Sequence, residues 1–218
     1  MTDEMDEKER RSAFASAMTT EHFVLQTAIA ATINEGASRA SIYVFSLSSS
    51  LVAMGFAAQS QTAFMPFVGT VLPAVFLLGV FTVLRLIDIA AENMQAHIGI
   101  ARIRAYYRTL GAQAELYFAA DRGRWPEGKT EPSLRIGALV GYVTTAASMI
   151  ASINAIVAGA GVTLLVTRLS RGDLRMALPA GTACVAVLLV VFFAYQRYRI
   201  TDLVDAWESS EGSADDAH

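Results

Sequence analysis

The chain has 218 residues, of which 54% are hydrophobic and 17% are charged, whereas soluble domains carry about a quarter of their residues as charges. No Asp, Glu, Lys or Arg falls in residues 40–84, 136–167 or 176–196, which excludes a soluble enzyme with one water-facing surface. The net charge of −3 excludes a strongly basic nucleic-acid-binding surface, and the single cysteine, Cys184, excludes an internal disulfide.

The first predicted elements are an acidic segment and a helix. Residues 1–20 are rich in Asp and Glu, and we expect them to be disordered. Residues 21–39 contain no Pro and a single Gly, Gly36, and their apolar residues recur at near-helical spacing. They predict a cytoplasmic helix that runs directly into the first membrane span.

The longest charge-free window predicts two spans. A membrane helix needs about 20 residues, and residues 40–84 are about twice that length. A polar patch at residues 59–62, with the sequence QSQT, interrupts them. We therefore predict spans at 40–58 and 64–84, joined by a tight turn.

The region 85–135 is predicted to be a cytoplasmic helical extension followed by a loop. Apolar residues recur alternately every three and four positions from Leu84 to Ala105, which predicts a helix to about Leu116. An exposed apolar seam needs a partner, and the candidates are the 21–39 helix and a second copy of the chain. We expect a cytoplasmic bundle completed by homo-oligomerisation; packing within one chain is the alternative.

The second half of the sequence predicts another hairpin, with spans at about 139–163 and at 176–196. Residues 197–218 are predicted to be a cytoplasmic tail, and its last ten residues are expected to be disordered. Of the 17 Lys and Arg residues, only Arg168, Arg171 and Arg175 lie in the turn of this hairpin. Basic residues favour the cytoplasmic side. The sequence thus predicts an all-α polytopic protein of the cell membrane, with four spans in two hairpins and both termini in the cytoplasm.

Charged residues gather at the predicted cytoplasmic end of the first hairpin. Equal distances from the turn near Ser60 place Glu35 level with Arg85; Arg39 follows Glu35 by four residues, and Asp88 follows Arg85 by three. One hypothesis is that these four residues form an ion-pair latch that holds a gate or binds a small anion. The alternative is that each of them only flanks a span and reaches lipid phosphates.

Polar and small residues mark the third predicted span. Small side chains, which let helix backbones approach closely, recur at every fourth position: Ala147, Ala151, Ala155 and Gly159. Asn154, near the middle of this span, needs a hydrogen-bond partner in hydrocarbon. Ser49 and the other serines of residues 46–50 are the candidate partners. Asn154 would either join helices or line an aqueous path.

No residue set predicts catalysis, a metal site or a cofactor. His22, His97 and His218 match no metal-ligand spacing, and Cys184 has no neighbouring base. The sequence contains no glycine-rich phosphate loop. No acid or lysine lies within a predicted span, which argues against ion-coupled transport. We expect a non-enzymatic protein without a cofactor.

Several segments carry a resemblance to a known family. They are residues 25–28 (LQTA), 35–36 (EG), 39–41 (RAS), 46–56 (SLSSSLVAMGF), 103–107 (IRAYY) and 145–149 (TAASM). With them, residues 20 to 200 resemble a family of uncharacterised actinobacterial membrane proteins, which implies the four-span architecture but no activity. In layout the chain is also similar, more distantly, to membrane-spanning effectors of nucleotide-signalled antiphage systems, in which a cytoplasmic segment senses a signal and the spans perturb the membrane.

Two classes of function follow. The first is a homo-oligomeric membrane assembly, as a gated pore or membrane-perturbing effector, whose cytoplasmic helices respond to a protein or to a small anionic signal. The second is a scaffold or partner subunit that anchors another protein; a transporter is less favoured. A polar stripe facing a symmetry axis would indicate the first class, and an apolar axis would indicate the second.

Overall fold

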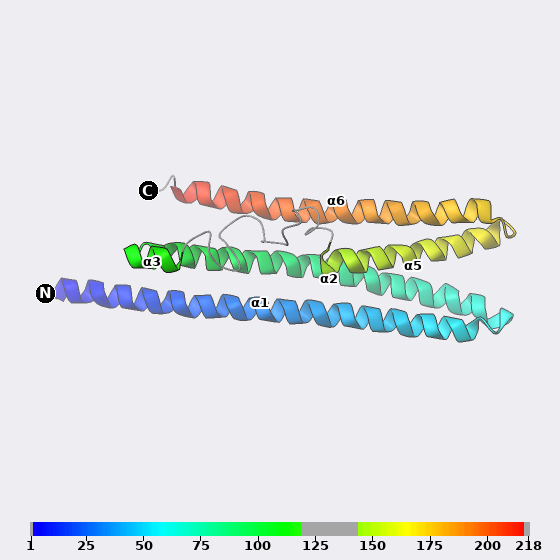
Figure 1. The fold of residues 1–218 in the computed structure, drawn as a ribbon, viewed down its shortest axis with the longest axis horizontal. Helices are drawn as coiled ribbons and strands as arrows, with labels where there is room; N and C mark the ends of the chain where they lie inside the picture. Colours follow the sequence, from blue (N-terminus) through cyan, green and yellow to red (C-terminus); the bar gives the residue numbers. More distant parts are fainter. Residues whose placement is uncertain (1, 119–143, 216–218) are drawn as a thin grey trace. The chain divides into compact units, whose positions relative to one another are not determined.

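The computed structural model describes residues 2–118 and 144–215, and its elements in these ranges are α-helices (Figure 1). They are α1 (Thr2–Ala57), α2 (Gln61–Arg108), α3 (Ala112–Tyr117), α5 (Ala146–Leu169) and α6 (Leu174–Asp215). Four of them, α1, α2, α5 and α6, are long and apolar enough to cross a membrane. A helix satisfies its backbone hydrogen bonds within itself, as the bilayer requires. The predicted all-α polytopic membrane fold is confirmed.

The first half of the chain differs from the sequence predictions at two boundaries. Helix α1 already begins at Thr2, where the sequence predicts a disordered segment. Glu7 accepts hydrogen bonds from Arg10 and Arg11 at 2.6 and 2.9 Å, and such pairs three and four residues apart support a helix. Helix α2 ends at Arg108 instead of continuing to about Leu116, because Gly111 has a φ of 154°, which a helix cannot accommodate.

The second half also differs at two boundaries. Helix α5 covers residues later than the predicted span at 139–163, because Thr145 caps its start by accepting a hydrogen bond from the Ser148 amide at 3.1 Å. Helix α6 continues to Asp215, through most of a tail end that the sequence predicts to be disordered. The predicted loop after residue 118 lies outside the described residues.

The described chain divides into two compact units, and α1 and α2 contribute to both. The first unit contains residues 2–34 and 89–118. Here the Phe14 ring meets the edge of Tyr106 with centroids 5.0 Å apart. A Cβ added at Gly99 would lie 2.8 Å from Cδ1 of Leu25, so the two helices approach closely. In this unit, α2 packs against α1 of the same chain.

The second unit contains residues 35–88 and 144–215. Helices α5 and α6 lie side by side in it (Figure 1), joined by a turn in which Arg171 and Gly172 have positive φ. Its core joins residues from all four long helices: Tyr43, Val75, Val83, Leu86, Ile87, Ala147, Ile150, Ala151 and Phe192. This unit holds the residues that the sequence singles out as candidate sites.

Candidate functional site

Glu35 on α1 is the centre of a group of charges. Arg85 on α2 donates from Nε and Nη2 to the two carboxylate oxygens of Glu35, both at 2.9 Å. Arg39 donates from Nε to Oε1 of the same carboxylate at 2.8 Å. The hydrogen bonds from Arg85, and then those from Arg39, lower the pKa of Glu35 from 4.5 to about 2. The carboxylate is therefore ionised at any physiological pH.

Asp88 does not join this group. It accepts a hydrogen bond from Nη2 of Arg199 on α6 at 3.0 Å, so α2 binds α1 through Arg85 and α6 through Asp88, one turn apart. Arg199 was missed by the sequence analysis, although it follows the last charge-free window by only three residues. We call the five residues Glu35, Arg39, Arg85, Asp88 and Arg199 the ionic cluster.

The α6 side of the ionic cluster holds buried polar atoms without hydrogen bonds. Gln196, one turn before Arg199, is 3% exposed. Its Oε1 and the Nε of Arg199 are buried and have no hydrogen-bond partner among the described residues. Such groups destabilise the packed state. The contact of α6 with the rest of the unit is therefore incompletely satisfied at this end.

Asn154 on α5 forms a second polar site, inside the apolar core. Its side chain is 5% exposed, accepts a hydrogen bond from the Tyr43 hydroxyl at 3.3 Å and donates one to the Phe76 carbonyl at 3.2 Å. Gly79 leaves the space for it, because a Cβ there would overlap the Asn154 amide. Asn154 thus joins α5 to α1 and α2.

The predicted serine partners of Asn154 are not its partners in the structure. Ser49 is exposed, on another face of α1 from the buried Tyr43. The side chain of Tyr43 reaches Asn154 from six residues earlier, and the sequence analysis did not consider it. A tyrosine within an otherwise apolar span was the available signal, because a buried hydroxyl needs a partner.

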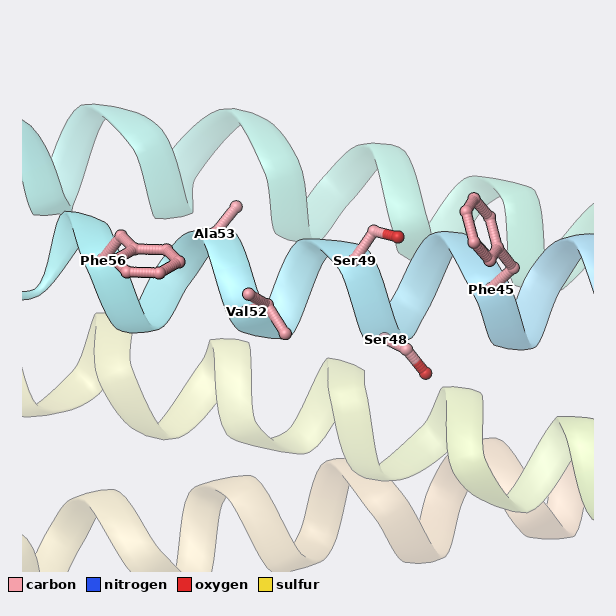
Figure 2. A pocket seen from close by; sticks show the side chains of 6 residues that line it. All are labelled: Phe45, Ser48, Ser49, Val52, Ala53 and Phe56. Atoms are coloured by element: carbon pink, nitrogen blue, oxygen red, sulfur yellow. The ribbon is translucent and has the colours of Figure 1, made fainter.

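Ser49 instead contributes to a hollow on α1 (Figure 2). The hollow is lined by residues of this helix alone: Phe45, Ser48, Ser49, Val52, Ala53 and Phe56. Phe45 and Phe56 stand at its two ends, with the smaller side chains between them (Figure 2). The residues of the hollow belong to the face of the span that the rest of the second unit leaves uncovered.

The small residues of α5 pack as their spacing predicts. Ala147, Ala151, Ala155 and Gly159 are all buried. Gly159 faces Gly181 of α6, since a Cβ at either glycine would lie 2.9 or 2.7 Å from the carbonyl oxygen of the other. Backbones this close replace the hydrophobic driving force that helices lack in lipid.

The described residues contain no group of three or more His, Cys, Asp and Glu side chains that could hold a metal ion. No protein-family model matches the sequence, and no curated protein or solved structure matches it.

Proposed function

We propose that the protein is a non-enzymatic membrane assembly of several copies, which opens or perturbs the bilayer as a gated pore or effector. In this proposal the ionic cluster and both termini lie on the cytoplasmic side of the cell membrane, because 14 of the 17 Lys and Arg residues would then be inside. The ionic cluster acts as the latch that keeps the assembly closed.

The observation that carries the proposal is the way α2 is fastened at its charged end. Helices α5 and α6 are held by the Gly159–Gly181 contact, and Asn154 fastens α5 to α1 and α2 within the core. At the charged end, the ion pairs of α2 to α1 and α6 are only partly buried, and such pairs contribute little to stability. This end can therefore open while the apolar core stays packed.

The chemistry of the latch favours an anionic signal. A small anion that binds the guanidinium of Arg85 or Arg199 would compete with Glu35 or Asp88, because arginine binds phosphates and carboxylates with the same geometry. A cytoplasmic protein with an acidic surface would have the same effect. Either partner would release α2 from α1 or from α6.

Liposome leakage tests the proposal. The double variant Glu35→Gln/Asp88→Asn removes both carboxylates of the latch, and we expect several-fold faster release of an entrapped dye than with the wild-type protein. Glu7→Gln is the matched control, since it weakens two ion pairs of α1 outside the latch, and it should leave release unchanged. Equal release by the wild-type protein and the double variant would refute the latch.

A scaffold is the second candidate function. The part of α1 before Glu35 exposes large apolar side chains, with Phe23 63% exposed beside Val24. Exposed apolar groups outside the spans are typical of protein-binding surfaces. If the protein is a scaffold, liposomes that contain any of these variants should release no dye. Phe23→Ser should then weaken the binding of the partner protein.

A further inference from the structure

The hollow on α1 exposes apolar side chains that are large at its ends and small in its centre. Phe45 and Phe56 are 75% and 69% exposed, and between them lies an open hollow of about 510 Å³. Among the candidate spans, that of α1 is the least buried by the rest of the chain. Tyr43 and Leu47 turn the opposite face of this helix into the core, so the hollow faces outward.

The serines in the hollow differ from the hydroxyl residues of the other three spans. On α2, α5 and α6, hydroxyls donate to the backbone carbonyl four residues earlier: Thr70, Thr82, Ser152, Thr163, Thr167 and Thr182. Ser48 and Ser49 make no hydrogen bond to any described residue. Lipid tails offer no hydrogen-bond partner, so a surface that covers these serines must supply donors and acceptors.

We propose that the hollow binds the same hollow on a second copy of the chain, an inference that rests on the proposed assembly of several copies. All copies insert in one orientation, so a two-fold axis between two of them runs along the membrane normal and pairs their α1 helices in parallel. Residues of the same number then meet at the same depth. A serine hydroxyl both donates and accepts, so Ser48 and Ser49 satisfy their own counterparts.

The shape of the face agrees with this pairing. Phe45 and Val52 are seven residues apart, as are Ser49 and Phe56, which is the repeat of helices that pack side by side. In the parallel pair, Phe45 and Phe56 lie at the depths of their own counterparts, and Ser49 and Ala53, four residues apart, permit close approach between them. Because Ser48 and Ser49 supply both the donor and the acceptor that their counterparts need, this face favours a second copy over an unrelated protein.

Cysteine cross-linking in liposomes tests the interface. In a Cys184→Ala background, Ser49→Cys should form a disulfide-linked dimer on mild oxidation. Leu51→Cys is the matched control, because Leu51 is also exposed and lies at nearly the same depth, about 200° around the helix; it should stay monomeric. Ser49 and Leu51 are both exposed, so neither substitution removes a buried side chain.

A second pair of variants tests the hollow itself. Ala53→Leu fills the hollow and should abolish the cross-link at position 49, whereas Val44→Leu, an exposed change outside the hollow, should leave it intact. Cross-linking at position 51 that equals that at position 49 would overturn the inference. Light scattering separates it from the proposed function: oligomers without a position-49 cross-link refute this interface alone, and monomers refute both.

Discussion

Gly79 and Asn154 provide the sharpest test of how the spans are held together. Gly79→Ala places a methyl group where the Asn154 amide lies, so this side chain must turn away and lose its hydrogen bonds to Tyr43 and Phe76. Hydrogen bonds between membrane helices contribute about 0.6 kcal/mol on average and about 1.7 kcal/mol at most. Two of them predict a loss of about 1 to 3 kcal/mol.

The assay is reversible unfolding by sodium dodecyl sulfate in mixed micelles, followed by the near-ultraviolet circular dichroism of the tyrosines. Gly69→Ala is the control, because it lies on the same helix with nothing within 4 Å of the added Cβ. It carries the same gain in helix propensity without the overlap, so the difference between the two variants isolates the contact with Asn154.

A double-mutant cycle decides whether the loss passes through Asn154. Asn154→Ala alone removes the same two hydrogen bonds and should cost a similar free energy of unfolding. In that background, Gly79→Ala has no amide to displace and should cost little, which gives a coupling energy of about 1 kcal/mol or more. Additive losses from the two substitutions would refute the reasoning.

Three further predictions concern other contacts of the second unit. Gly181→Ala forces α5 and α6 apart and should cost about 1–3 kcal/mol in the same unfolding assay, whereas Gly161→Ala, with its nearest atom at 3.7 Å, should be nearly neutral. The pKa of Glu35 is lowered from 4.5 to about 2, so its ion pairs contribute their full stability above about pH 4.5 and lose it progressively as the pH falls from there through about 2. Isotope-edited infrared spectra should show an ionised carboxylate at about pH 4, and a protonated one there would contradict the assignment. Asp88→Asn removes the charged partner of Arg199 and should broaden spin-label distances between α2 and α6 but not those between α1 and α2; unchanged α2–α6 distances would show that this pair does not hold α6.

The parts of the fold that the sequence predicts well are those set by local composition. Windows without charge must lie in lipid, and they indicate the four long helices. Equal distances from the turn near Ser60 place Glu35 beside Arg85, because two antiparallel helices leave only one register once the turn is known. The depth of a residue in the membrane follows from the number of residues that separate it from the turn.

The rotation of each helix about its own axis does not follow from the number of residues along the chain. Asn154 has Tyr43 and several serines of α1 at similar depths, and only the packing of side chains decides which of them faces it. Arg199 binds Asp88 for the same reason: α6 is rotated so that its buried Phe192, and one turn later Gln196, face the core. Sequence spacing does not contain this information.

The rotation of α1 also links the core to the proposed assembly. Turning Tyr43 inward satisfies the buried amide of α5, and the same turn directs Ser48 and Ser49 outward, where no described residue forms a hydrogen bond with them. Tyr43, Ser48 and Ser49 of α1 are thus divided between an intramolecular hydrogen bond on one face of the helix and an unsatisfied surface on another face. Since the ion pairs of Glu35 lie at the charged end of the same helix, a signal that frees Arg85 would act on the helix that carries the outward face, and pairing of copies and release of the latch would be coupled through α1.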